Sequence, residues 1–146
     1  MNDNLSAYEN RVLEFVSQNP RNKLVITNKS IKDLTFHSMD KDLSFLIMNI
    51  KNDKRFSLRA KDLIYNYLND TIHNNDQYGK HLAISGVGIL LEKELQFDFT
   101  SFLDSYSQNH LLFLKWEGEI INDTLYFLTK QHGLKINISN LSYKVL

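Results

Sequence analysis

The sequence predicts a three-layer α/β domain, in which a mostly parallel sheet carries helices on both faces. Short, continuously apolar runs at 24–26, 82–84 and 111–114 are typical of strands that are buried on both sides. Segments with apolar residues at helical spacing separate these runs, and such alternation of strands and helices favours a parallel sheet. The 146 residues contain no repeat or linker, so we expect a single domain over 1–146.

Two helices are predicted in the first third of the chain. The first covers about 5–18 and ends before Pro20, because proline disfavours helical geometry in the residue that precedes it. Asp40 is the expected N-cap of the second. Phe45 and Met48 widen the apolar face of that second helix, so we expect it to be buried on two sides.

Two more helices follow. Ser57 is the expected cap of a helix with apolar residues over 60–68, and the polar stretch 73–77 is expected to be an exposed loop. Asp98 precedes apolar residues at i, i+3, i+4 and i+7 over 99–106, which predicts a capped helix.

The remaining segments are expected to be extended. A strong strand is predicted at 111–116, another at 125–128, and alternating apolar residues predict an extended tail over 134–145. Segment 31–37 fits either a short strand or a turn of helix. The later strands could form an antiparallel hairpin at the edge of the sheet.

Composition excludes several classes of function. Seventeen basic and seventeen acidic residues cancel to a formal charge of zero, which argues against a general nucleic-acid-coating protein. The absence of cysteine excludes disulfides, thiolate metal sites and cysteine nucleophiles. The first residues lack the pattern of a signal peptide, and apolar runs such as 89–91 are far too short for a membrane span. We therefore expect a cytoplasmic protein with no membrane partner.

No catalytic constellation, metal site or cofactor site is predicted. The five histidines include no pair at the i, i+4 spacing of a helical zinc site. Asp40-Lys41-Asp42 lacks the glycine and glutamate of a calcium loop. Ser85 follows a strand, but its neighbours do not form the Gly-x-Ser-x-Gly elbow of a hydrolase.

A phosphate site survives only as a remnant. A P-loop needs Gly-x-x-x-x-Gly-Lys-Ser/Thr after a strand, so that backbone N–H groups can surround the phosphate. Here the strand at 24–27 runs directly into Asn28-Lys29-Ser30, without either glycine. The strand at 82–84 ends in Ser85, where a magnesium-binding acid would be needed. Lys29, Ser30 and Ser85 are therefore the candidate residues of a nucleotide site that has lost its function.

The second half of the chain also carries a family pattern. Its main part is Leu-Ala-Ile-Ser-Gly-Val-Gly-Ile-Leu-Leu-Glu-Lys-Glu-Leu over 82–95, and it continues with Phe102-Leu103, Ser107-Gln108-Asn109, Leu114-Lys115-Trp116-Glu117-Gly118, Leu125 and His132. The pattern resembles the Walker B half of the small P-loop protein of type 3 BREX phage-defence systems, BrxF. The resemblance covers about 24–132, with most of its signal after Leu82.

The departures from that family indicate lost catalysis. Ser85 stands where the family has the Walker B Asp, Gly88 where it has the following acid, and Gln108 where it has Arg. The P-loop is deleted. The resemblance therefore implies a P-loop-NTPase-like core without a functional P-loop, and a scaffolding or regulatory role.

Three functional hypotheses follow. The first is a non-catalytic subunit of a bacterial anti-phage defence or DNA-associated complex, which binds other protein subunits. The second is a nucleotide-sensing or nucleotide-hydrolysing enzyme with a non-standard phosphate site, formed by Lys29 with Arg55 or Arg59. The third is a small nucleic-acid-binding module, contacting the backbone through Lys54, Arg55 and Arg59.

Overall fold

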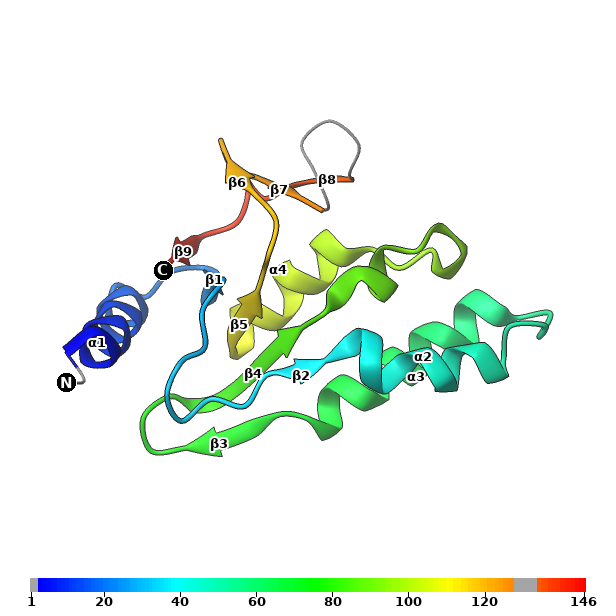
Figure 1. The fold of residues 1–146 in the computed structure, drawn as a ribbon, viewed down its shortest axis with the longest axis horizontal. Coiled ribbons are helices and arrows are strands. Elements are labelled where there is room, and N and C mark those ends of the chain that lie inside the picture. The colour runs from blue at the N-terminus through cyan, green and yellow to red at the C-terminus, as the bar shows by residue number, and fades with distance from the viewer. Residues whose placement is uncertain (1–2, 128–133) are drawn as a thin grey trace.

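The main sheet is mostly parallel, which confirms the predicted fold class. The computed structural model describes residues 3–127 and 134–146 (Figure 1). Five parallel strands stand in the order β2-β4-β5-β1-β9, and β3 pairs antiparallel with β4. The strands are β1 (Leu24–Thr27), β2 (His37–Ser38), β3 (His73–Asn75), β4 (Gly79–Ser85), β5 (Leu111–Lys115) and β9 (Tyr143–Val145).

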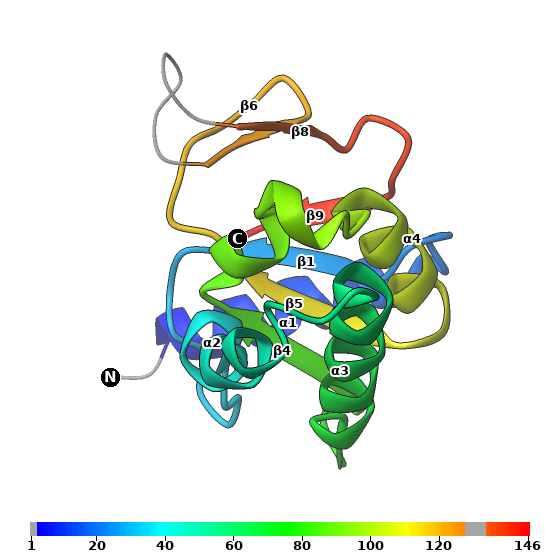
Figure 2. The ribbon, with the colours of Figure 1, turned by 90° about the vertical axis from the view of Figure 1, so that its right-hand side faces the viewer.

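Helices cover both faces of this sheet. Figure 2 shows α1 on one side and α2, α3 and α4 on the other. The steps β2 to β4 and β4 to β5 run in one direction across the sheet, so right-handed crossovers place their helices on the same face. Within the described ranges, no helix is both long and apolar enough to cross a membrane. The helices are α1 (Asp3–Ser17), α2 (Met39–Asn49), α3 (Phe56–Asp70), α4 (Phe99–Asn109), and the 3₁₀ helices η1 (Val87–Leu91) and η2 (Lys93–Leu95).

Each face of the sheet has its own hydrophobic core, because successive side chains of a strand point to opposite faces. In β5, Leu112 and Leu114 pack with α2, α3 and α4, whereas Phe113 packs on the other face with Val12 of α1. The loop after β1 contributes Ile31 to this second core. Helix α1 thus covers the face that the β1–β2 connection, which carries no helix, leaves open.

A small second sheet replaces the predicted edge hairpin. Strands β6 (Ile120–Ile121), β7 (Thr124–Tyr126) and β8 (Lys135–Asn137) are antiparallel and form a separate sheet. The predicted strand at 125–128 is shorter than expected, and Leu128 lies outside the described residues. The hydroxyl of Tyr143 donates to Asp123 and so ties β9 to the β6–β7 turn, and this bond raises the pKa of Tyr143 to about 12.

Three local predictions were wrong. Helix α2 begins at Met39 with Ser38 as its N-cap, not at Asp40, because the side chain of Asp40 is bonded elsewhere. Helix α3 begins at Phe56 after Arg55, not after Ser57. The polar stretch 73–77 contains β3 rather than only loop, since it pairs with the start of β4. The cap at Asp98 is confirmed, because its carboxylate accepts from the N–H of Ser101 at 2.9 Å.

The predicted two-sided burial of α2 is also wrong. Its inner stripe, Met39, Leu43 and Ile47, is buried in the core. Phe45 and Met48 are each 71% exposed. Apolar periodicity shows that a helix has an apolar face, but not how much of that face the rest of the chain covers.

The buried side-chain amide of Asn22, just before β1, connects β1 with α4 and with the segment before β9. Asn22 is fully buried, and its Nδ2 donates to the backbone oxygen and Oδ1 of Asp104 on α4, at 3.1 and 2.8 Å, and to Oγ of Ser107 at 3.1 Å. Its Oδ1 accepts from the N–H of Ser142, just before β9, at 3.1 Å. The bond from Asn22 is also the main reason that the pKa of Asp104 lies below its ordinary value.

We expect Asn22→Ala to lower the free energy of unfolding by about 2–3 kcal/mol, because it leaves buried partners without hydrogen bonds. Chemical denaturation measures this change. Asn52→Ala is the matched control, since Asn52 is exposed and makes no side-chain hydrogen bond within the described residues; its effect should stay below about 0.5 kcal/mol. Equal losses in the two variants would contradict the role of Asn22.

Candidate functional site: a cavity at the strand ends

The candidate site is a cavity of about 450 Å³ at the carboxyl ends of two neighbouring parallel strands. In open α/β sheets, ligands bind at this edge. The cavity lies where β4 passes into η1, where β5 ends, and where α2 begins. Its lining consists of Ser38, Asp40, Ser85, Gly86, Val87, Gly88, Lys115, Trp116, Glu117, Gly118 and Phe127.

Glycines form one wall of the cavity. Gly86 has a φ of +54°, a conformation that other residues rarely adopt, and a Cβ there would lie 2.7 Å from Oγ of Ser38. A Cβ on Gly88 would lie 2.9 Å from the ring of Phe127. The backbone after β4 can therefore approach α2 and Phe127 only because these positions lack side chains.

Asp40 joins α2 to η1 at the same edge. Its backbone N–H donates to the oxygen of Gly86 at 2.8 Å, and its Oδ1 accepts from the N–H of Ile89 at 2.6 Å. Sequence reasoning placed no acid beside Ser85. Asp40 stands 49 residues before Ile89, so no local signal could have predicted this contact.

The end of β5 and the residues directly after it form another part of the lining. Nζ of Lys115 lies 3.5 Å from Oγ of Ser30 and 5.7 Å from the ring centre of Phe36. Trp116 is only 3% exposed, and its indole N–H has no acceptor within the described residues. Next to it, a Cβ on Gly118 would collide with the backbone oxygen of Tyr126 at 1.9 Å.

The lining supplies an ammonium group, two carboxylates and two serine hydroxyls. None of the described lining residues is a histidine that could activate a hydroxyl. These ammonium, carboxylate and hydroxyl groups can form hydrogen bonds and ion pairs with a small polar molecule.

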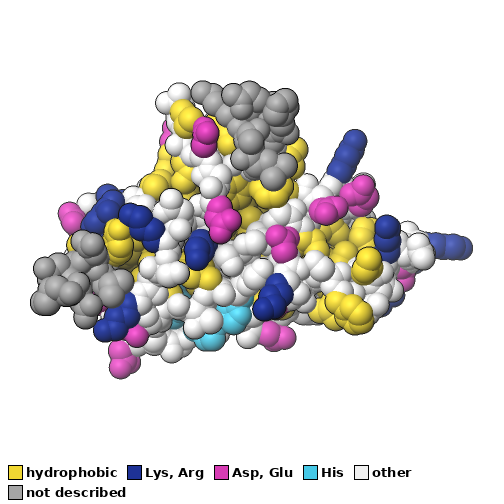
Figure 3. Space-filling model, viewed as in Figure 1, with side chains coloured by type: hydrophobic (Ala, Val, Ile, Leu, Met, Phe, Trp, Pro, Cys, Tyr) yellow, Lys and Arg dark blue, Asp and Glu magenta, His cyan; other side chains and the backbone are white. Residues whose placement is uncertain are grey.

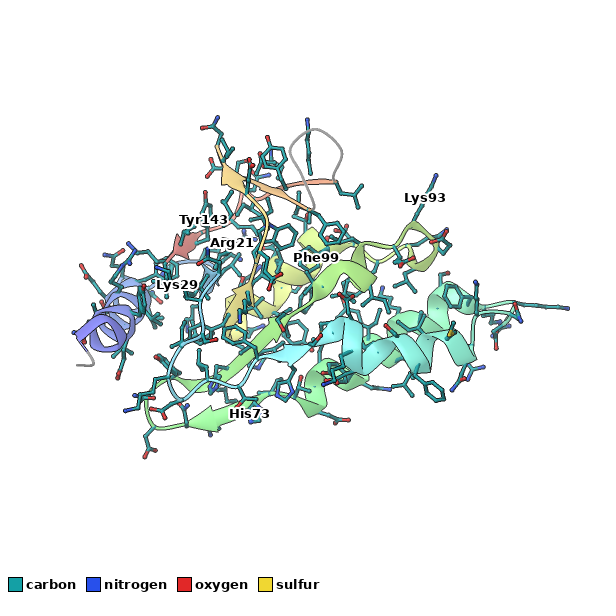
Figure 4. The ribbon with its side chains drawn as sticks, in the orientation of Figure 1. Arg21, Lys29, His73, Lys93, Phe99 and Tyr143 are labelled. Carbon is teal, nitrogen blue, oxygen red and sulfur yellow. The ribbon has the colours of Figure 1, made fainter. Side chains whose placement is uncertain are left out.

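The structure only partly assembles the predicted remnant phosphate site. Ser85 lines the cavity, and Ser30 lies beside Lys115. Lys29 lies next to α1 (Figure 4), where its Nζ donates to the hydroxyl of Tyr8 at 2.7 Å. The lysine that lines the cavity is Lys115, which was not predicted from the sequence as a site residue.

The predicted nucleic-acid contacts lie elsewhere, at the tip of the hairpin formed by α2 and α3. Arg59 forms an ion pair with Asp53 at 2.6 Å. The N–H of Arg55 and the side chain of Arg59, in that order of effect, lower the pKa of Asp53. Lys54 is exposed. None of these residues lines the cavity, and binding of nucleic acid through them stays a prediction.

Two distant histidines come together at the edge of the sheet. Nε2 of His37 on β2 and Nε2 of His73 on β3 are 2.9 Å apart. No local spacing predicts this pair, because β2 and β3 meet only through their pairing with β4. Within the part of the chain that the structure describes, no group of three or more histidine, aspartate or glutamate residues could hold a metal ion.

The residues at which the chain departs from the BrxF pattern occupy different places. Ser85 and Gly88 line the cavity. Gln108 lies on α4 and donates to Oδ1 of Asp104 at 3.1 Å, away from that edge. His132 lies outside the described residues.

Comparison with protein-family models, with curated proteins and with solved structures gives no match for this chain.

Two glycine substitutions test the geometry of the site. Gly79 also has a positive φ, of +64°, but nothing lies within 4 Å of its added Cβ. We expect Gly79→Ala to lower the free energy of unfolding by about 1 kcal/mol and Gly86→Ala by about 2–4 kcal/mol, since only the second also forces Ser38 to move. Chemical denaturation compares the two, and equal losses would contradict the close approach of Ser38.

Proposed function

We propose that the chain is a non-catalytic, NTPase-like subunit of a bacterial anti-phage defence complex, and that it acts in the cytoplasm by binding another protein. The resemblance of residues 24–132 to BrxF proteins, with most of its signal after Leu82, supports the defence setting. The sheet, the strand-end edge and the surface of α2 support the other parts of the proposal.

The strand order supports an NTPase-like core. Numbered along the chain, the five parallel strands β1, β2, β4, β5 and β9 stand in the order 5-1-4-3-2. The strand β1, which is followed by the remnant Lys29-Ser30, therefore lies inside the sheet between β5 and β9. By fold-level analogy with P-loop NTPases, β1 corresponds to the phosphate-loop strand and β4 to the Walker B strand.

The chemistry at the ends of those two strands supports a non-catalytic role. The connection between β1 and β2 carries no helix in the structure, so no helix N-terminus follows β1 to bind a phosphate. Lys29 is engaged with Tyr8 instead. Ser85 ends β4 and offers a hydroxyl, which is a weaker magnesium ligand than a carboxylate.

The observation that carries the proposal is the exposed apolar surface of α2. Phe45 and Met48 are each 71% exposed, and Leu46 on the same helix is 43% exposed. Large aromatic side chains and methionine are enriched in protein–protein interfaces. Phe45 and Met48 are three residues apart and are therefore neighbours on the helix surface.

We expect the double variant Phe45→Ser/Met48→Ser to lose the protein that the wild type retains in affinity capture from its native host. Because both side chains are exposed, its free energy of unfolding should change by less than about 0.5 kcal/mol per substitution. Leu58→Ser is the control, since Leu58 on α3 is 63% exposed. A wild-type protein that stays monomeric and captures nothing would contradict the proposal.

Nucleotide sensing is the second candidate function, and the cavity at the strand ends favours it. Among the described residues that line this cavity, Lys115 is the only lysine. Arg55 and Arg59, which the sequence analysis proposed for this role, are not in its lining.

The melting temperature with and without Mg-ATP separates the two candidates. A bound ligand at 100 times its Kd adds about 2.7 kcal/mol to the free energy of unfolding. Nucleotide sensing predicts a clear increase for the wild type and none for Lys115→Met. An unchanged melting temperature of the wild type at millimolar Mg-ATP would remove this candidate.

A further inference from the structure

A second concave surface lies between α2 and the two 3₁₀ helices. This groove has a volume of about 450 Å³. Its floor is apolar, with Ile47 only 8% exposed and Leu95 only 3% exposed. The groove does not include any residue of the strand-end cavity. Its lining consists of Ser44, Ile47, Met48, Lys51, Phe56, Ile89, Glu92, Glu94 and Leu95.

The apolar surface of the groove continues onto the outside of α2. Met48 lies at its rim and is 71% exposed, and Phe45 lies one turn away on the outer surface. Figure 3 shows hydrophobic atoms gathered at this end of the molecule, with acidic side chains beside them. A methionine at such a rim can adapt its shape to different apolar partners.

The charges around the groove are asymmetric. Glu92 and Glu94 are exposed on the side of η2, and Lys51 is exposed at the end of α2. The ion pairs of the described residues are Arg21–Asp104 and Arg59–Asp53, so neither glutamate is neutralised there. Lys93 stands between them in sequence, but its side chain extends away from the molecule (Figure 4).

The walls limit the kind of segment that can bind. Both walls are helical, so they offer no strand edge for pairing. Recognition must come from side chains. An apolar floor beside free carboxylates is complementary to a segment with apolar residues on one face and basic residues on the adjacent flank.

We propose that this groove binds an amphipathic helix of a partner protein, with its apolar face against Ile47, Met48 and Leu95 and its basic flank against Glu92 and Glu94. The inference rests on the proposed function, because it names the chemistry of the partner. A helix about as long as α2, which has 11 residues, spans roughly 16 Å and presents about three turns to the groove.

Three fluorescent peptides of about 15 residues provide the probes. One has leucines at i, i+3, i+4 and i+7 with lysines on the flanks, the second has glutamates in place of the lysines, and the third has the composition of the first without its periodicity. Fluorescence anisotropy measures their binding to the full chain. We expect the basic amphipathic peptide to bind roughly tenfold more tightly than each of the other two.

Variants locate the site of binding. Met48→Asp should lower the affinity for the basic peptide by roughly tenfold. Glu92→Lys/Glu94→Lys should make the chain bind the acidic peptide more tightly than the basic one. Leu58→Asp on α3 and Glu14→Lys on α1 are the matched controls, since both residues are exposed and neither lines the groove. Unchanged melting temperatures establish that each variant is folded.

Three results would overturn the proposal. The first is that the basic peptide binds no better than the scrambled one. The second is a wild-type dimer that Met48→Asp converts to a monomer, because a second copy then occupies the groove. The third is host-partner capture that persists in Met48→Asp/Glu92→Lys/Glu94→Lys. This last result would leave the partner-binding function standing and refute only the groove.

Discussion

The right-handedness of parallel crossovers is the constraint on which the arrangement of this molecule depends. The chain moves in one direction from β2 through β4 and β5 to β9, so every connection along that path must lie on the same face. Helices α2, α3 and α4 and the small β6–β8 sheet share one hydrophobic core there. The step from β1 to β2 runs the opposite way and belongs to the other face. Because that connection carries no helix, α1 is needed to bury Phe113 and its neighbours.

The same topology creates the strand-end edge. Parallel strands direct their carboxyl ends to one side, where the chain must turn into helices. Here the turn after β4 approaches α2 so closely that Gly86 is required, and Asp40 bonds the two segments through both its backbone and its side chain. The edge is therefore held together by hydrogen bonds and close packing within the chain. The contacts of Asp40 and Gly86 position the connection after β4 against α2.

The sequence predicts those features that depend on local chemistry and misses those that depend on tertiary contacts. Apolar runs predicted β1, β4 and β5, and the carboxylate of Asp98 predicted the start of α4. The N-cap predicted at Asp40 was wrong, because its carboxylate accepts from the N–H of Ile89 instead. For the site, Ser85 was predictable from its place after a strand. Lys115 was not, because its approach to Ser30 comes from the pairing of β1 with β5.

Helix α2 combines a buried inner stripe with an exposed apolar outer surface. Its inner stripe of Met39, Leu43 and Ile47 is buried and holds the helix on the sheet. Phe45 and Met48 on its outer side contribute little to that packing, because most of their surface remains in water. The hydrophobic free energy of burying Phe45 and Met48 is therefore still available to a surface that covers them. A change at these positions can therefore alter binding while the fold persists, which is the property expected of an interface and not of a core.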